Sequence, residues 1–528
     1  MRFSLCAVLL AAVLPAAEVR ITVLATTDIH GNLLPYDYYT GRPAARGLAK
    51  VATIVRAERE SNPNTLLIDC GDTIQGTPLE YVYQRSDHAR PEPTILAMNA
   101  IGYDALTLGN HDFNYGLESL NRAREQAHFP WLSANTVGGT RPFQPYLVKS
   151  VGGVKVAVIG VTTPSIPLWE RPANYQGYRF EPIWESVART VEALRAKERP
   201  EVMVVALHEG VEGAEIPAGV DAVIYGHTHR QEAGRLQGNV LLVQPKNWAG
   251  AVAKVEFRVV DGKVAGKSSK LIPVTAETVA AEDIVKLAGP YHEAAERYLN
   301  TPVAEAPAAM EGKFGRIEDT ALVDAVQEVQ LACAHADVSF TALFNPRARV
   351  AKGPVTVRQL AAMYIYDNEL YAIEGDGGMV KAALENAARY YRTCPQPACT
   401  TGPLINPEVM GFNYDMAQGV SYEVDLRKPV GERIVNLRWK GRPLEAGQKL
   451  RIALNNYRAG GSAGYQMFRG ARVVWQSSTD IQDLMVSYYT EHKQLPARAD
   501  DNWRIVPAEA RRTLERETLA EAAATRER

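Results

Sequence analysis

The chain has 528 residues, which is too many for one ordinary hydrophobic core, so two or more domains are expected. Hydrophobic residues make up 46% of it and charged residues 22%, a balance that is typical of globular proteins and excludes wholesale disorder. The 58 basic and 60 acidic residues nearly cancel, so the overall charge does not indicate binding to a nucleic-acid polymer or a membrane surface.

Residues 1–17 have the pattern of a signal peptide. Arg2 forms a short basic region, residues 3–14 are apolar, and residues 15–17 are small residues that suit cleavage before Glu18. The apolar run is too short to span a bilayer, and no other long apolar stretch follows it. We therefore expect a periplasmic or secreted protein with no membrane anchor after signal removal; an uncleaved N-terminal strand or anchor is the alternative.

The five cysteines fit an exported protein. Cys394 and Cys399 flank a Pro-rich loop and could close a small disulfide. Cys6 belongs to the signal, while Cys70 and Cys333 stand in apolar surroundings and are expected to be buried free thiols. No cysteine spacing resembles a zinc knot.

Residues 19–273 alternate between β-like runs and amphipathic segments. The expected strands are short, rich in Val, Ile and Leu, and bounded by turn residues: 20–26, 65–69, 104–108, 154–161, 201–207 and 221–225. Helix-like stretches lie between several of them: 48–61, 118–127 and 184–197. This alternation predicts an α/β layered domain in which helices cover both faces of a central sheet.

The pattern changes after Lys270. Residues 276–298 are predicted to be helical, and residues 317–336 form an amphipathic helix that we interpret as the connector between domains, with a core helix as the alternative. A second α/β pattern follows. The predicted division is a catalytic domain at 18–316, the connector helix at 317–336, a second domain at 337–510 and a charged, solvated tail at 511–528.

Polar side chains follow the predicted strands at the point where each strand ends. They are Asp28, His30, Asp72, Asn110, His111, His208, His227 and His229. Residues two apart in an extended chain face the same way, so Asp28 with His30, and His227 with His229, can each hold one ion. The carboxyl ends of strands in α/β sheets meet in one crevice, so these groups are expected to converge. A single histidine after a strand is more often part of an ordinary turn; the recurrence favours a metal site.

The residue types define the metal chemistry. Gly109 is expected to let the backbone turn so that Asn110 and His111 both point towards the strand end. Two Asp, one Asn and four His exceed what one tetrahedral ion needs, so two divalent ions are implied: zinc, manganese, iron or a mixture. Two such ions lower the pKa of a bound water and neutralise phosphoryl oxygens, which suits phosphoester hydrolysis.

These motifs carry a family resemblance. Asp28-x-His30, Gly71-Asp72, Gly109-Asn110-His111, His208 and Gly226-His227-x-His229 resemble the signature of calcineurin-like metallophosphoesterases. The longer strings at 27–32, 71–78, 109–116 and 455–461 resemble the exported 5′-nucleotidase superfamily, closest to periplasmic bifunctional 2′,3′-cyclic-nucleotide 2′-phosphodiesterase/3′-nucleotidases. The resemblance covers nearly the whole mature chain. It implies a four-layer αββα metallophosphoesterase domain followed by a C-terminal α/β substrate-binding domain.

The resemblance also implies roles for the site residues. One ion would be held by Asp28, His30, Asp72 and His229, and the other by Asp72, Asn110, His208 and His227, with Asp72 bridging. His111 would stabilise the phosphorus centre or protonate the leaving alkoxide, with Asp112 as its acidic neighbour and second candidate catalytic residue. In 5′-nucleotidases an Asp three residues later orients this histidine; here that position is Asn114, so the partner of His111 stays open.

In the second domain, the resemblance implies that two aromatic rings hold the base. The matching positions are Tyr414 and Tyr465, although with 24 tyrosines in the chain ordinary packing is the alternative. The Asn-Gly-Gly-x-Arg segment of 5′-nucleotidases is replaced by Phe344-Asn345-Pro346-Arg347. Asn345 and Arg347 are the candidate substrate-binding residues of that altered segment.

We therefore expect an exported, monomeric, metal-dependent phosphoric ester hydrolase that acts on small-molecule nucleotides. The favoured reactions convert 2′,3′-cyclic nucleotides to 3′-nucleotides, and 3′-nucleotides to nucleoside and phosphate. The enzymatic alternatives are a 5′-nucleotidase, a nucleotide-sugar hydrolase and a sulfur-ester hydrolase of the same superfamily. The alternative from another class is a non-catalytic nucleotide-binding surface protein with a degenerate site.

Overall fold

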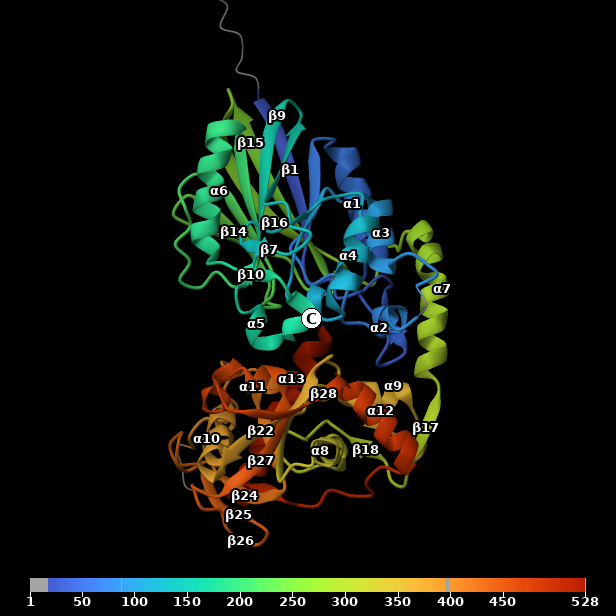
Figure 1. Ribbon diagram of the computed structural model, residues 1–528, viewed down its shortest axis with the longest axis vertical. Coiled ribbons are helices and arrows are strands. Elements are labelled where there is room, and N and C mark those ends of the chain that lie inside the picture. Colours follow the sequence, from blue (N-terminus) through green and yellow to red (C-terminus); the bar gives the residue numbers. More distant parts are fainter. Residues whose placement is uncertain (1–17, 87, 395–398, 528) are drawn as a thin grey trace, which may run out of the picture. The chain divides into compact units, whose positions relative to one another are not determined.

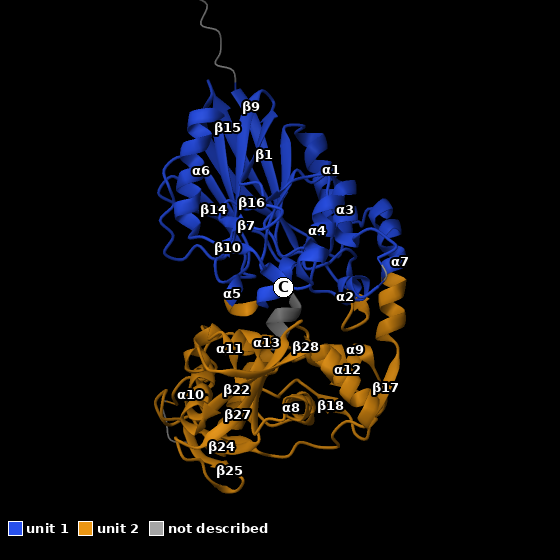
Figure 2. Ribbon diagram, in the orientation of Figure 1, with its two compact units in different colours: residues 1–36, 43–167, 171–291 blue, residues 37–42, 168–170, 292–528 orange. Residues whose placement is uncertain are grey.

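The computed structural model describes residues 18–86, 88–394 and 399–527, with side chains up to residue 521 (Figure 1). The predicted signal peptide and Cys6 lie outside the described residues. The chain divides into two compact units (Figure 2): unit 1 contains most of the residues up to Tyr291, and unit 2 contains residues 37–42, 168–170 and those from His292 onward. In the part of the chain that the structure describes, no helix has both the length and the apolar composition needed to cross a bilayer.

Unit 1 contains two six-stranded sheets. The first has the strand order β16 (Lys263–Pro273), β15 (Ala251–Val260), β1 (Glu18–Thr26), β4 (Thr65–Asp69), β5 (Ala105–Thr107) and β6 (Trp131–Leu132). The second has the order β13 (Glu232–Gln237), β14 (Val240–Gln244), β12 (Ala222–Tyr225), β11 (Val202–His208), β9 (Val154–Thr162) and β8 (Tyr146–Val151). All six predicted strands are therefore present, within two residues of the expected ends.

Apolar side chains from both sheets form one core. Val23 and Ile68 of the first sheet are fully buried in the same cluster as Val204 and Ile224 of the second. The outer faces are covered by helices, as Figure 1 shows: α6 (Ile183–Lys197) on the second sheet, and α1 (Leu48–Ser61), α3 (Pro93–Ile101) and α4 (Gly116–Gln126) on the side of the first. Unit 1 is thus the expected four-layer αββα domain.

The strand pairing explains why the polar loops meet. β1, β4 and β5 run parallel, with Thr26 opposite Asp69 and Asp69 opposite Leu106. β9, β11 and β12 are also parallel, with Leu207 opposite Tyr225. Because parallel strands end at one edge of their sheet, the loops that follow these strands are brought together.

A buried pair of carboxyl groups lies beside these loops. Glu80 is on α2 (Pro78–Gln84) and Glu92 caps the N-terminus of α3; the two side chains are 0% and 1% exposed. Burial raises the pKa of Glu80 well above its usual range and that of Glu92 to about 7, and the nearby Glu92 carboxyl raises the pKa of Glu80 further. Two buried carboxylates that lie close together repel each other, which favours protonation of one of them, so the pair retains a proton near neutral pH.

Replacing Glu80 with Gln is expected to reduce the pH dependence of unfolding. The unfolded chain releases these protons near its ordinary pKa of 4.5, whereas folded Glu92 holds its proton to about pH 7. The free energy of unfolding therefore falls as pH rises through that window, by roughly 1–3 kcal/mol. Gln keeps a donor for Glu92 without a titrating proton. Thermal unfolding measured from pH 4.5 to 8 tests this, with exposed Glu60→Gln as the control; an unchanged pH profile in Glu80→Gln would contradict it.

Unit 2 is built on a five-stranded sheet and a smaller four-stranded one. The larger has the order β23 (Asp415–Gln418), β19 (Val338–Ala342), β27 (Lys449–Asn455), β22 (Glu369–Asp376) and β28 (Val473–Asp480). The smaller has the order β26 (Arg442–Pro443), β25 (Ile434–Trp439), β24 (Val420–Asp425) and β29 (Trp503–Val506). The helices are α8 (Ala321–Ala334), α9 (Val357–Met363), α10 (Gly377–Ala387), α11 (Asn456–Ala459), α12 (Ile481–His492) and α13 (Arg511–Glu527).

The connector prediction is corrected by this arrangement. The helix expected at 317–336 is α8, which lies within unit 2 and buries both Asp324 and Val329. The chain passes between the units inside α7 (Glu282–Leu299) instead, between Tyr291 and His292. The stripe of apolar residues on α8 is therefore a core stripe, which was the alternative interpretation.

The expected solvated tail is also corrected. Residues 511–527 form α13, on which Leu514 is fully buried. The Glu517 carboxylate accepts hydrogen bonds from the backbone N–H groups of Leu404 and Ile405. A charged, Ala-rich segment thus packs through one apolar and one acidic side chain.

The cysteine predictions are largely confirmed. Cys394 and Cys399 form a disulfide, with their Cα atoms 5.2 Å apart. Cys70 is a buried free thiol, whereas Cys333 is free but only half-buried.

Candidate metal centre

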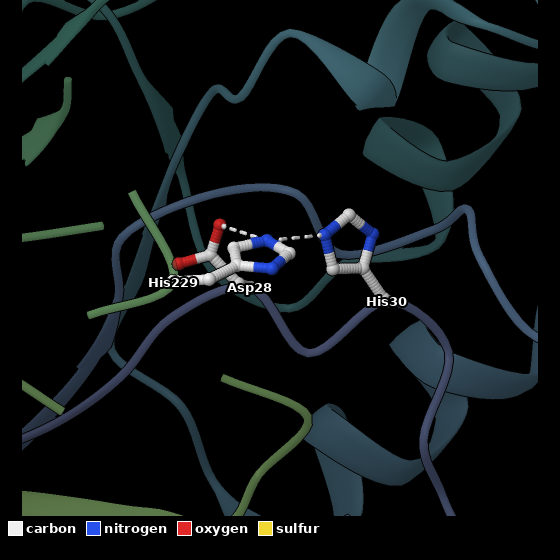
Figure 3. Close-up of side chains that lie close together, drawn as sticks. All are labelled: Asp28, His30 and His229. Carbon is white, nitrogen blue, oxygen red and sulfur yellow. Dashed lines mark hydrogen bonds and ion pairs between the residues drawn. The ribbon is translucent and has the colours of Figure 1, made fainter. Parts of the chain in front are cut away.

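Six of the seven predicted metal ligands form two groups of three. The ligand atoms of Asp28, His30 and His229 all lie within 4.8 Å of one another, and so do those of Asp72, His208 and His227. Figure 3 shows the first triad, with the His229 ring between the Asp28 carboxylate and the His30 ring. His229 Nε2 is 3.3 Å from Asp28 Oδ1 and 3.2 Å from His30 Nε2.

Asp72 touches both triads. Its Oδ2 atom is 3.0 Å from His208 Nε2 and 3.9 Å from His30 Nε2. The seventh predicted ligand, Asn110, joins the second triad, with its Oδ1 3.2 Å from His208 Nε2. These positions fit two ions that share Asp72.

The backbone at the ligands is strained. Asp28, His30, Asp72, His227 and His229 all have positive φ values, between 48° and 69°. Non-glycine residues adopt this conformation rarely, and such strain collects at functional sites where the surrounding structure enforces it.

The glycines beside the ligands allow close approach. A Cβ on Gly109 would lie 2.2 Å from the backbone N of Asp72, and one on Gly226 would lie 1.9 Å from Thr27 Oγ1. Gly109 was expected to let the backbone turn, and its φ is not among the positive values of the described residues. The absence of a Cβ at Gly109 lets the Asp72 loop pack against the Asn110 loop.

Main-chain carbonyls orient two of the histidines. His30 Nδ1 is 3.0 Å from the carbonyl oxygen of Gln75, and His208 Nδ1 is 2.7 Å from that of Cys70. A carbonyl can only accept, so each Nδ1 carries a proton, and in the neutral form of each ring the lone pair is on Nε2. Both imidazoles are thus prepared to bind an ion through Nε2.

The charges at the site also fit a cation. Asp28 and Asp72 are at most 1% exposed, and within the described residues their only ion-pair partners are imidazoles. Burial disfavours the charged form of His208, but the Asp72 carboxylate outweighs it and raises the His208 pKa to about 10. Burial would likewise raise the Asp72 pKa, yet His208 holds it well below its usual range. A divalent ion bound here would neutralise the Asp72 carboxylate in place of the proton on His208.

His111 stands beside both triads without belonging to either. Its backbone N–H donates to Asp72 Oδ1 over 2.7 Å, and its ring lies 5.3 Å from the His30 ring between centroids. His111 Nδ1 is 2.6 Å from Asn114 Oδ1. The partner left open by the sequence is therefore Asn114, placed by the single helical turn His111–Phe113.

Asp112 has a structural position that does not support its predicted catalytic role. It is 1% exposed, and its two oxygens accept hydrogen bonds from the backbone N–H groups of Thr73, Ile74 and Gly109. These bonds join the Asp72 loop to the Asn110 loop. Asp112 is a positioning residue, and spacing could have shown this, because residues adjacent on a helical turn point apart.

The predicted base-binding tyrosines lie among the core residues of unit 2, and base binding by them stays a prediction. Tyr414 is 2% exposed and Tyr465 0%. The Tyr465 ring stacks on Phe468 at an interplanar angle of 5°, and the Arg458 guanidinium covers it. Gly-rich flanks suggested a loop, but burial depends on long-range packing that the local sequence does not contain.

The altered segment in unit 2 forms a turn. Asn345 Nδ2 donates to the Ala362 carbonyl, and Asn345 Oδ1 accepts from the Arg347 backbone N–H over 3.0 Å. The amide of Asn345 therefore stabilises the turn, whereas the Arg347 side chain is exposed. Substrate binding by Arg347 stays a prediction.

Two family models match the chain. Residues 21–231 match the calcineurin-like phosphoesterase model, and residues 302–470 match the 5′-nucleotidase C-terminal domain model. The first match contains all seven predicted metal ligands.

Similar proteins are known from several bacteria. A 2′,3′-cyclic-nucleotide 2′-phosphodiesterase/3′-nucleotidase from Haemophilus influenzae is 30% identical over 93% of this chain and 88% of its own length. The trifunctional nucleotide phosphoesterase YfkN from Bacillus subtilis is also 30% identical, but this chain spans only 39% of it. A Staphylococcus aureus structure provisionally described as a 5′-nucleotidase, in complex with alpha-ketoglutarate, superposes with a TM-score of 0.81 at 25% identity, covering 92% of this chain and all of that one.

Proposed function

Because the chain belongs to the 5′-nucleotidase family of calcineurin-like metallophosphoesterases, and is therefore a nucleotide phosphoesterase, we propose that it hydrolyses 2′,3′-cyclic nucleotides and 3′-nucleotides. The observation that carries the proposal is the position of Asp72, in contact with both ligand triads and with the backbone of His111. This arrangement provides two adjacent cation sites and a nearby imidazole in one place.

The residues of the candidate site have separate roles in the proposed hydrolysis. Asp28, His30 and His229 would hold one divalent ion, Asn110, His208 and His227 the other, and Asp72 both. When bound, the two ions supply a nucleophilic water at neutral pH and neutralise charge on the phosphoryl oxygens. Asn114 orients the His111 ring, so that Nε2 can contact the phosphoryl group or the leaving oxygen.

Two observations support the cyclic-nucleotide and 3′-nucleotide specificity over the 5′ specificity. The relative from Haemophilus influenzae matches this chain over 93% of the chain's length. The partner of His111 is the neutral Asn114, where the resemblance to 5′-nucleotidases would place a carboxylate. A neutral partner orients the His111 ring without placing a negative charge beside it, as a carboxylate would.

A direct comparison of substrates tests the proposal. The purified protein, loaded with manganese or zinc, is given 2′,3′-cyclic AMP, 3′-AMP and 5′-AMP under the same conditions. We expect kcat/KM for the first two substrates to exceed that for 5′-AMP by about tenfold or more. A preference for 5′-AMP would contradict the proposed specificity, and no hydrolysis of any of the three would contradict nucleotide hydrolysis altogether.

We further propose that the protein is exported to the periplasm or beyond. The disulfide between Cys394 and Cys399 supports this, because disulfides persist in oxidising compartments and are rare in the cytosol. Cell fractionation with an antibody against unit 2 tests it, and retention of the protein with cytosolic markers would contradict it.

A further inference from the structure

The imidazoles of the two triads differ in how firmly they are held. His30 and His208 are 8% and 0% exposed, and a main-chain carbonyl meets Nδ1 of each. The His229 side chain is 36% exposed. Among the residues that the structure describes, its Nδ1 atom contacts only the Asn247 side-chain amide, with 3.3 Å between Asn247 Nδ2 and His229 Nδ1. His229 is thus the most weakly oriented of these three imidazoles.

Asn247 belongs to a strained turn that joins β14 to β15. The next two residues, Trp248 and Ala249, have φ values of 60° and 53°, which is uncommon for any residue and more so for a bulky one. The Trp248 backbone N–H donates to the Asp28 carbonyl over 2.7 Å, and its carbonyl accepts from the Gly47 N–H over 3.3 Å. These bonds keep the turn in its strained conformation.

The Trp248 side chain also fixes the turn. Its indole is 37% exposed, and the Arg46 guanidinium lies 4.8 Å from the ring centroid. A guanidinium stacked on an indole contributes roughly 0.5–1 kcal/mol at exposed sites. The turn thus contacts two members of one triad: Asp28 through the Trp248 backbone and His229 through the Asn247 amide.

We propose that Asn247 is a positioning residue for His229, and that the ion held by Asp28, His30 and His229 is the more weakly bound of the two and depends on Asn247. The proposal rests on the dimetal centre of the proposed function, not on its substrate. In the second triad, His208 receives its orientation elsewhere, from the Cys70 carbonyl and from Asn110. Loss of the Asn247 amide should therefore weaken the binding of one ion and leave the affinity for the other unchanged.

The required hydrogen bond has a defined direction. An imidazole that binds an ion through Nε2 carries its proton on Nδ1, so its partner must accept. A 180° rotation of the Asn247 amide about its Cβ–Cγ bond places Oδ1 instead of Nδ2 next to His229 Nδ1. This rotation provides the acceptor. Asn247→Ala removes the acceptor, whereas Asn247→Asp keeps it.

Metal titration tests the proposal without any substrate. Protein freed of metal by a chelator is titrated with Mn²⁺, and free ion is followed by electron paramagnetic resonance, with folding checked by circular dichroism. We expect two Mn²⁺ per wild-type chain. In Asn247→Ala one of the two should bind about 10–100-fold more weakly while the other is unchanged. Asn247→Asp should stay within about threefold of the wild type or bind more tightly, because its carboxylate also accepts from Nδ1–H.

Exposed Asn239, in the turn between β13 and β14, provides the matched control, and Asn239→Ala should leave both affinities unchanged. The proposal is overturned if Asn247→Ala keeps both affinities, if it weakens both equally, or if Asn247→Asp binds as poorly as Asn247→Ala. A wild-type chain that binds fewer than two Mn²⁺ would instead contradict the dimetal centre, and with it the proposed function. A wrong substrate assignment would leave the titration unaffected.

Discussion

His111→Ala is expected to keep both metal ions and to lose about 10²–10⁴-fold in kcat, the usual contribution of a positioned acid or base. The side chain belongs to neither triad, so its removal takes away no ligand. The backbone N–H that donates to Asp72 Oδ1 remains in the variant. The imidazole, by contrast, is oriented by Asn114 and lies next to His30, beside the candidate metal centre.

The measurement pairs steady-state turnover with metal content per chain. His128→Ala is the matched control, because His128 is an exposed histidine of the same unit with no assigned role. Unchanged turnover in His111→Ala would remove His111 from the mechanism. Loss of metal in parallel with turnover would mean that His111 helps to hold an ion rather than to contact the substrate.

Asp72→Asn is expected to bind both ions poorly and to lose more than about 10³-fold in activity. The Asp72 carboxylate lies close to an imidazole of each triad, with Oδ2 3.0 Å from His208 Nε2 and 3.9 Å from His30 Nε2. An amide keeps the shape but removes the negative charge that attracts both cations. It also leaves buried His208 without its carboxylate, which in the metal-free protein should cost about 3–5 kcal/mol of stability.

Metal content after dialysis and thermal unfolding without metal measure these two effects separately. Asp104→Asn is a suitable control, because Asp104 is also a largely buried carboxylate of unit 1 but pairs with Lys149 and Arg59 and with neither triad. Two ions retained at wild-type affinity in Asp72→Asn would exclude Asp72 as the shared ligand.

Local pattern was enough to find the candidate metal ligands. Each is a polar residue directly after an apolar run, and β-strands end where such runs end. Parallel pairing of β1 with β4, and of β11 with β12, then carries Asp28, Asp72, His208 and His227 to the same region. The division of the ligands into two triads followed the family resemblance, and the grouping of the side chains in the structure agrees with it.

Side-chain partners were not predictable in the same way. Asp112 and Asn114 both stand close to His111 in the sequence, and only the path of the backbone decides which one its imidazole meets. The turn His111–Phe113 directs Asn114 to Nδ1 and buries Asp112 against the backbone of Thr73, a residue 39 positions away. Asn247 likewise contacts His229 because β14 leads the chain back to the first triad.

The sequence by itself determined the two α/β domains and the candidate metal ligands at the strand ends, since each depends on short-range pattern or spacing, and it indicated a possible disulfide. Only the tertiary structure decided that Tyr414 and Tyr465 are buried, that α8 is a core helix, that residues from 511 onward form a packed helix, and that Asn114 and Asn247 serve the histidines. The physical reason is the same in each case. Burial and hydrogen-bond partners depend on residues far away in the chain, which only the folded backbone brings within contact distance.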